Sequence, residues 1–537
     1  MDSIEIYLGL WGLSLLVGLV FNRTSIPVPL MLVIAGMIVG FIPGLPPVEL
    51  QPDLILNVFL PLLVYGASAN FSWTDVRHNL RPIILLSIGH VFFIAVCVAI
   101  VIHWLLPSLG WPLSFVLGAI VAPPDDIAIL AIADKIYFPS RVLTILKGES
   151  LLNDATALIL FRFSLAAVIT HQFAAVSALS SFVLVIVGET LYGIVLGNLL
   201  GQIRVRIKDP MLQMMASLLT PFLAYLPPEK LGGCGVLATV VTGFVIGHQY
   251  LERLPPDVRL TSLSVWTTLG FALQSIIFLM VGLNLELTLE GIASIPGLAL
   301  LKYSSAVVLT IILGRFAWVF PSAYLPRHFF PSIRKREPTP PWQQPFLVSW
   351  SGMRGVISLA AALAIPQLPA MTSGANPKDL LVFLVFTVII VTLLLQGLSL
   401  PWLMKKLGLH CLGQREKYRE HLSELTARLL ISKASLRWLL QYKKTLKNKP
   451  LLIEKVELRL QEYKIRCRRL SNVLNDHHRM EMHDDEEEQQ ESQFLSAQIN
   501  ELERAELLRL WHANKISHSI RSKLLQQLDH RFQHITG

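Results

Sequence analysis

The sequence predicts an all-α membrane protein with about thirteen transmembrane helices, followed by a charged helical tail. Three observations support this fold class. Of the 537 residues, 53% are hydrophobic and only 15% are charged, whereas soluble domains carry about 25% charged residues. Before residue 410, apolar runs recur with the length of about 20 residues that crosses a hydrocarbon core of about 30 Å. The short loops between these runs alternate in their content of lysine and arginine.

The apolar runs divide the first part of the chain into thirteen candidate spans. Their approximate limits are 4–21, 26–42, 53–70, 82–105, 112–133, 146–170, 179–202, 211–227, 233–249, 262–284, 294–322, 344–366 and 379–404. One set of loops and span ends holds seventeen Lys and Arg residues, and the other set holds only Lys230, Lys302 and Lys378. Because the Lys and Arg bias sets orientation, we expect an external N-terminus and a cytoplasmic C-terminus. The first run lacks the flanks of a signal peptide, so we expect it to be retained as a helix.

Net charge and cysteine content exclude several other classes. The formal net charge is +9, but much of it lies in short loops, where it sets topology. We therefore expect membrane lipid around the protein and no nucleic-acid partner. The four cysteines show neither metal-ligand spacing nor a paired framework.

The last part of the chain has a different character. Residues 411–537 are charged and nearly free of glycine and proline. Leucines recur there at steps of three and four residues, as on an amphipathic helix, at Leu422, Leu425, Leu429, Leu436 and Leu439. A second helical stretch is expected near 497–511, after an acidic linker at 484–488. We therefore expect a transmembrane domain over 1–410 and a cytoplasmic tail over 411–537. The sequence does not identify what the tail binds.

Span five contains two prolines followed by two carboxylates near its middle. Pro123 and Pro124 remove two backbone donors and obstruct the helix, and Asp125 and Asp126 follow directly. Carbonyl groups freed at this depth need a cavity or buried partners. A broken helix beside carboxylates suits a cation site, because unwound carbonyls and half-helix ends coordinate ions. A simple kink with its carboxylates near an interface is the alternative.

Span six carries the carboxylate that we expect to bind the ion. Glu149 and Asn153 are four residues apart and share a helix face, whereas Asp154 is rotated by about 100° from Asn153. Asp154 can therefore face a crevice while Glu149 packs elsewhere. Sodium is a hard cation that prefers oxygen ligands, which a carboxylate beside a carboxamide supplies. Burial disfavours the charged form of a carboxyl group, so the same group can carry a proton. A purely structural pairing of Asp154 is the alternative.

Span twelve contains a buried arginine between two glycines. Gly352, Arg354 and Gly355 lie inside an apolar stretch and predict a second unwound segment. This segment comes seven spans after the first, as an inverted repeat of six spans plus a linking span requires. Arg354 needs an anion, and Glu149 is the candidate, in a pair that we expect to be structural.

Three further charged residues within predicted spans are expected to pair with opposite charges. Arg315 in span eleven is a further buried cation, which we expect to offset the charge of carboxylates near the crossing. Arg162 and Glu189 are expected to form a structural pair between spans six and seven.

These motifs resemble the cation:proton antiporter-1 family of sodium/proton exchangers, over roughly residues 5–406. The best match is the run Gly-Glu-Ser-Leu-Leu-Asn-Asp-Ala-Thr-Ala at 148–157, supported by residues 122–125 and 352–355. The pattern is most similar to the bacterial branch with long cytoplasmic tails. The resemblance implies a thirteen-span inverted-repeat fold with a dimerisation domain and a mobile core domain. It also implies that the unwound segments of spans five and twelve cross each other.

The resemblance further implies roles for individual residues. Asp154 would carry the cation and the proton, with Asn153 as its neighbour. Pro124, Asp125 and Asp126 would supply the span-five part of the site, so that Na⁺ binds at Asp154 and Asp125. Glu149 and Arg354 would form a stabilising pair.

At the level of the whole protein, the resemblance implies a secondary active antiporter. It would exchange protons for monovalent cations, sodium first among them, by alternating access and without net charge movement, because Asn153 stands where electrogenic relatives have a second aspartate. We expect a homodimer in the cell membrane that serves pH homeostasis, with no cofactor apart from the transported ions.

Two departures from the family pattern bear on ion selectivity. Where many relatives have Thr-Asp-Pro in span five, this chain has Pro124-Asp125-Asp126, which removes a hydroxyl ligand and adds a carboxylate. Residues 60–67 of span three lack the glutamate that some relatives carry there. Selectivity among Na⁺, Li⁺ and K⁺ therefore stays open, and K⁺/H⁺ exchange is the main alternative.

Other classes of membrane protein fit the sequence less well. A Gly-Asp pattern is typical of intramembrane aspartyl proteases, but no Gly-Asp dipeptide occurs in the chain. The His-Glu-x-x-His motif of zinc enzymes does not occur either. We therefore expect no enzyme. A channel assembles rings of carbonyls or charges around an axis, whereas here paired broken helices lie in one chain. A proton-coupled transporter of an organic substrate is a further alternative.

Overall fold

The computed structural model describes residues 3–21, 28–42, 51–133, 136–170, 175–250, 253–292, 295–337, 339–366, 376–446 and 450–480, together with 505 and 509. Every secondary-structure element in these ranges is a helix. The chain divides into two units, Met1–Glu416 and Lys417–Gly537. Each is described by itself.

The first unit contains the helices that correspond to the predicted spans. Its first half comprises α1 (Ser3–Phe21), α2 (Val28–Gly40), α3 (Pro52–Leu54), η1 (Ile55–Phe59), α4 (Leu60–Ala69), α5 (Trp73–His78), α6 (Leu80–Ile84), η2 (Leu85–His90), α7 (Val91–Leu105), η3 (Pro107–Leu109), α8 (Gly110–Val121), α9 (Ile127–Ala133) and α10 (Ser140–Thr170). Its second half comprises α11 (Ala175–Arg206), α12 (Pro210–Lys230), α13 (Val236–Gln249), α14 (Pro256–Leu283), α15 (Leu285–Gly291), α16 (Gly297–Phe329), α17 (Pro331–Arg336), α18 (Gln343–Trp350), α19 (Val356–Leu363) and α20 (Pro377–Lys406). The last helix, α21 (Leu409–Thr445), begins in this unit.

Each of the thirteen predicted spans coincides with one of these helices or with a consecutive series of them. Among the described residues, seven helices are long and apolar enough to cross a membrane, and four shorter apolar helices accompany them. The two other predicted spans are α12, which contains three prolines, and the pair α18–α19, which is interrupted in the middle. The predicted all-helical polytopic fold with two interrupted helices is therefore confirmed.

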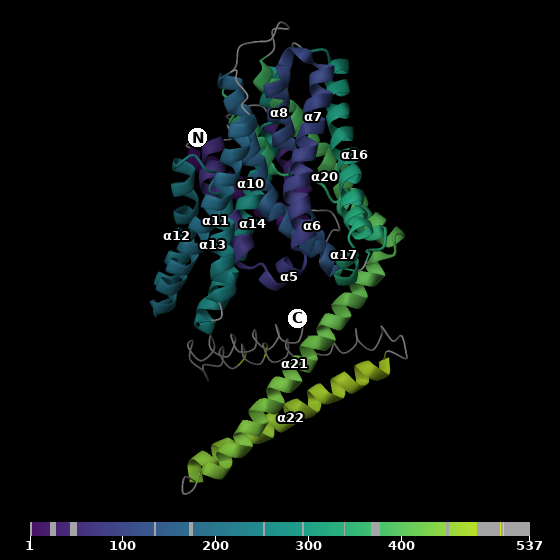
Figure 1. The fold of residues 1–537 in the computed structure, drawn as a ribbon. Helices are drawn as coiled ribbons and strands as arrows, with labels where there is room; N and C mark the ends of the chain where they lie inside the picture. The colour runs from purple at the N-terminus through teal and green to yellow at the C-terminus, as the bar shows by residue number, and fades with distance from the viewer. Residues whose placement is uncertain are drawn as a thin grey trace. The chain divides into compact units, whose positions relative to one another are not determined.

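Small residues allow the closest helix contacts in the first unit. In Figure 1, α11, α12 and α13 lie side by side, and all three pack together. Helix α2 packs along α14, where Gly36 lies against the Leu279 carbonyl and Gly282 against the Val33 carbonyl. A Cβ atom at either glycine would overlap the facing backbone. Close backbone approach at small residues is a common basis of helix association in membranes.

A π-helical turn shapes span four. Helix α6 continues through the wide turn η2 into α7, and the carbonyl of Leu85 accepts a hydrogen bond of 2.9 Å from the indole Nε1 of Trp318 on α16. A wide turn leaves a carbonyl group without its usual partner within the helix, and here the neighbouring helix supplies one. The turn ends at His90, whose Nδ1 lies 3.9 Å from the carboxylate of Glu149.

The second unit contains the rest of α21 and α22 (Pro450–Met480). Lys443 and Glu457 form an ion pair of 2.5 Å between the two helices. Val456 and Leu460 of α22 and Leu429 of α21 are buried. The helical character predicted for the beginning of the tail is confirmed. The predicted acidic linker at 484–488 lies outside the described residues, as does the predicted second helix at 497–511 apart from 505 and 509.

Candidate cation site at two interrupted helices

The first interruption separates α8 from α9. Helix α8 ends at Val121 and α9 begins at Ile127, so that residues 122–126 are not helical. Pro123 and Pro124 have no N–H group to continue the hydrogen-bond ladder. The Asp125 side chain caps the start of the next helix, since its Oδ1 accepts a hydrogen bond of 2.9 Å from the backbone N–H of Ile127. A side-chain acceptor in this place satisfies an otherwise unpaired donor at a helix start.

The second interruption separates α18 from α19, and it meets the first. Residues 351–355 are not helical. The backbone N–H of Asp125 donates a hydrogen bond of 2.7 Å to the carbonyl of Met353. Gly355 lies so close to the Asp125 carboxyl group that a Cβ atom at this position would overlap it. The two unwound segments therefore touch backbone to backbone, as predicted for crossed helices.

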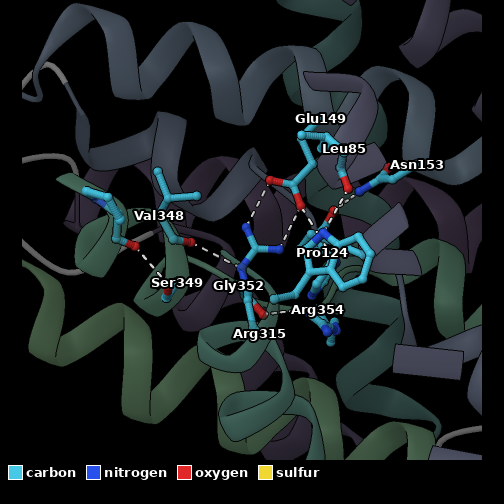
Figure 2. Close-up of polar contacts among 12 residues, drawn as sticks. Leu85, Pro124, Glu149, Asn153, Arg315, Val348, Ser349, Gly352 and Arg354 are labelled. Atoms are coloured by element: carbon cyan, nitrogen blue, oxygen red, sulfur yellow. Dashed lines mark hydrogen bonds and ion pairs between the residues drawn. The ribbon is translucent and has the colours of Figure 1, made fainter. Parts of the chain in front are cut away.

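Asn153 attaches α10 to the first interruption. Its Nδ2 donates a hydrogen bond of 2.6 Å to the carbonyl of Pro124 (Figure 2), and its side chain is fully buried. Its Oδ1 has no hydrogen-bond partner among the described residues. Asp154 is half-buried and faces a cavity instead. This difference between neighbours agrees with the predicted rotation of about 100° between them.

A cavity of about 570 Å³ collects the three predicted carboxylates. Asp125, Asp126 and Asp154 all line it, together with Lys147 and Ser150 of α10. The rest of the lining is mostly apolar and comes mainly from α4, α9, α14 and α19. Three carboxyl groups and one ammonium group leave an excess of negative charge when all are ionised. Such a cavity favours a bound cation or protons on the carboxyl groups.

The predicted pair of Glu149 with Arg354 is wrong. Arg315 of α16 makes the contact instead, since its Nη1 and Nη2 donate to Oε1 and Oε2 of Glu149 at 2.6 and 2.9 Å (Figure 2). Its Nε donates to the carbonyl of Val348 at 3.1 Å. The carboxylate that Arg315 neutralises is therefore Glu149 of span six. All three side chains, including that of Arg354, are only 1% exposed.

Arg354 is held by backbone carbonyls. Its Nε donates to Val121 at 2.7 Å, its Nη1 donates to Gly352 at 2.5 Å, and its Nη2 has no partner among the described residues. Val121 is the last residue of α8, where carbonyl groups lack partners within the helix. Arg354 thus links the two interruptions. A cation is favourable beside the C-terminus of a helix, which gives the physical reason for the corrected assignment.

The second predicted pair, Arg162 with Glu189, is also wrong. Arg162 binds the carboxylate of Glu229, at the end of α12, and the carbonyl of Gly233. Glu189 accepts hydrogen bonds from the backbone N–H groups of Cys234 and Gly235 at 2.6 and 3.0 Å. Backbone N–H groups at the start of α13 therefore stabilise the Glu189 carboxylate in place of an arginine.

Sequence reasoning missed two polar residues that α10 contributes to the cavity. Lys147 is one of the seventeen Lys and Arg residues whose distribution predicts the topology, and it also lies two turns before Asp154 on α10. Ser150 lies four residues before Asp154, on the same face of the helix. The helical spacing from Asp154 was the signal that could have identified both.

An all-helical membrane protein whose two interrupted helices cross beside carboxylates has the architecture of a secondary transporter. Comparison with known families agrees, because the model described as "Sodium/hydrogen exchanger, transmembrane" matches residues 12–406. The chain belongs to this family, which is one of multi-pass membrane transporters, and the resemblance found in its motifs is confirmed.

Individual relatives extend the comparison. An uncharacterized Na⁺/H⁺ exchanger of Mycobacterium tuberculosis is 32% identical over 391 residues, covering 72% of this chain and 71% of the relative. The Na⁺/H⁺ antiporter ApNhaP of Aphanothece halophytica is 30% identical over 440 residues, covering 80% and 78%. The structure of the sodium proton antiporter MjNhaP1 from Methanocaldococcus jannaschii has a TM-score of 0.58 at 19% identity, covering 75% of this chain and 99% of that protein. At this identity, the structural likeness supports the fold.

Proposed function

We propose that the protein is a secondary active antiporter that exchanges protons for monovalent cations, sodium first among them, on Asp154. The observation that carries this proposal is the crossing of the two interrupted helices beside a cavity that contains Asp154, Asp125 and Asp126. Membership of the sodium/hydrogen exchanger family supports the same function.

In this mechanism, a proton and a cation compete for one carboxylate. Asp154 supplies the exchangeable oxygen ligands, and Asn153 anchors α10 to the Pro124 carbonyl so that Asp154 stays beside the interruption. Asp125 supplies a second carboxylate, of which Oδ1 already accepts a hydrogen bond from Ile127. Oxygen ligands suit a hard monovalent cation. A cation is released when a proton takes its place, which couples the two flows.

Access to Asp154 must alternate between the two sides of the membrane. The cavity extends toward Lys147, about 10 Å before Asp154 along α10. About 12 Å beyond Asp154 in the other direction, the pairing of Arg162 with Glu229 joins α10 to α12. We infer that Asp154 is reached from the Lys147 side in this conformation, and that the Arg162–Glu229 contact rearranges when access changes.

An exchange assay in proteoliposomes tests the function directly. Purified protein is reconstituted with a pH-sensitive dye inside, and Na⁺, Li⁺ and K⁺ are added outside in turn. The proposal predicts cation-driven proton efflux that is largest with Na⁺. A response to K⁺ alone would replace sodium by potassium as the substrate, and no response to any inorganic cation would favour an organic substrate.

We predict one-for-one exchange that does not respond to the membrane potential. Asn153 cannot carry a proton next to Asp154, and Lys147 in the cavity offsets the charge of one further carboxylate. Sodium-driven proton flux is measured with and without a potassium–valinomycin clamp, and the two rates should agree. A clear change with potential would contradict this prediction and would make Asp125 or Asp126 the second proton carrier.

The remaining features of the proposal concern the whole protein. We propose that it resides in the cell membrane as a homodimer, with its N-terminus outside and residues 411–537 in the cytoplasm, and that it serves pH homeostasis. The distribution of lysine and arginine among the loops supports this orientation. Apart from the transported ions, the exchange as proposed needs no cofactor, and its only bond changes are the binding and release of protons at carboxylate oxygen atoms.

A further inference from the structure

Three arginines from three helices line a small pocket apart from the cation site. Arg81 belongs to the first turn of α6, Arg141 to the first turn of α10, and Arg327 to the last turn of α16. The pocket has a volume of about 60 Å³. Since about 10–15 Å³ holds one water molecule, the pocket has room for a group of several heavy atoms. We name it the arginine pocket.

The charges of the arginine pocket are not balanced by the described residues. Arg327 donates to the carboxylate of Glu337 at 2.9 Å, and Arg81 lies 3.2 Å from the same oxygen atom. Arg141 donates only to the neutral Asn79 side chain, at 3.3 Å. The Glu337 carboxylate therefore pairs with two of the three arginines. The three arginines and Glu337 together carry a net charge of about +2.

Hydrogen-bond donors are also left over. The Nε and Nη1 atoms of Arg81 are buried and have no partner among the described residues. The side chain of Arg327 is only 4% exposed, and Arg141 and Arg81 both act on it electrostatically. Buried donors without acceptors are costly, and so are buried like charges without a counterion. An acceptor with negative charge would remove both costs.

The chemistry of the arginine pocket identifies this acceptor. Guanidinium groups bind phosphate through paired N–H donors. A phosphate monoester carries a charge of about −1.5 to −2, which matches the excess of the four charged groups. The rest of the lining includes apolar residues of predicted spans, among them Leu86, Val319 and Val348. An apolar wall beside a basic pocket at the ends of transmembrane helices suits the phosphate of a lipid headgroup.

We propose that the arginine pocket binds a phosphate group, which either an anionic phospholipid or a soluble phosphate compound can supply. Neither the charge balance nor the free donors of the pocket depend on cation exchange, so the proposal stands separately from the proposed function.

The test is the thermal unfolding of the full-length protein in detergent. Phosphatidylglycerol and phosphatidate are added in one arm, with zwitterionic phosphatidylcholine as control, and inorganic phosphate is added in the other arm, against chloride at equal ionic strength. The proposal predicts that at least one of these phosphate sources raises Tm of the wild type by several degrees. It also predicts that Arg141→Gln loses at least half of this shift. Arg141 suits the test because its removal leaves no carboxylate without a partner.

Arg334→Gln is the matched control, because it removes the same charge from an exposed residue of α17. This variant should keep the full shift. A shift with the anionic lipids alone assigns the site to a headgroup, and a shift with inorganic phosphate assigns it to a soluble ligand. Native mass spectrometry of the wild type counts bound phospholipid without relying on a variant. Equal shifts in the wild type and Arg141→Gln would overturn the proposal, as would the absence of any shift together with no retained phospholipid.

Discussion

Asp154→Asn is expected to reduce sodium-driven proton flux in proteoliposomes to the background of empty liposomes. Asparagine has nearly the same size as aspartate but neither titrates nor carries the negative charge that attracts a cation. Asp154 is half-buried and lines the cavity of about 570 Å³, so that the substitution removes chemistry without leaving a void. The variant should elute as a single species on size exclusion and unfold near the wild-type Tm.

The two other carboxylates of the cavity are the natural comparison. Asp125→Asn should lower the apparent affinity for sodium, because it replaces a second carboxylate of the proposed site by a neutral amide. Asp126→Asn should have a smaller effect. Cation-driven proton flux that persists in Asp154→Asn would refute the role of Asp154. Equal and complete loss of flux in all three variants would contradict the expected order of their effects on exchange.

Glu149→Ala and Arg315→Ala should each lower Tm in detergent strongly. The two side chains form a bidentate ion pair of 2.6 and 2.9 Å, and both are 1% exposed. Removal of one partner leaves an uncompensated buried charge, which costs about 3–5 kcal/mol. The double variant should be more stable than the sum of the two single effects predicts, because it leaves neither charge behind.

Arg354→Ala separates the observed pair from the one expected from the sequence. Arg354 binds backbone carbonyls of Val121 and Gly352, so its removal leaves Glu149 paired with Arg315. We expect a smaller loss of Tm in this variant and little coupling with Glu149→Ala. Strong coupling between Arg354 and Glu149 in a double-mutant cycle, with none between Arg315 and Glu149, would contradict the geometry described here.

Local features of the sequence predicted the interruptions and the direction of Asp154. Pro123 and Pro124 obstruct the helix in which they occur, whatever packs around it. The angle between Asn153 and Asp154 likewise follows from helix geometry alone. These properties depend only on near neighbours in the chain, and the structure reproduces them.

The partners of buried charges depend on which helices lie side by side, and this could not be predicted. Arg315 and Arg354 are both buried cations, and periodicity along a helix does not say which of them faces Glu149. In the same way, the sequence does not show that Arg162 faces Glu229 and not Glu189. Glu189 is satisfied by backbone N–H groups at the start of α13, a type of acceptor pairing that a search for opposite charges overlooks.

The hydrogen bond between Asp125 and Met353 has a consequence for the synthesis of the protein. The partner of the Asp125 backbone N–H emerges from the ribosome about 230 residues later, which takes roughly 10–50 s at about 5–20 residues per second. During this interval, the backbone N–H of Asp125 lacks its final partner, and unsatisfied backbone groups are costly in lipid. The nascent N-terminal half must therefore keep this segment hydrated or in contact with the insertion machinery until span twelve arrives.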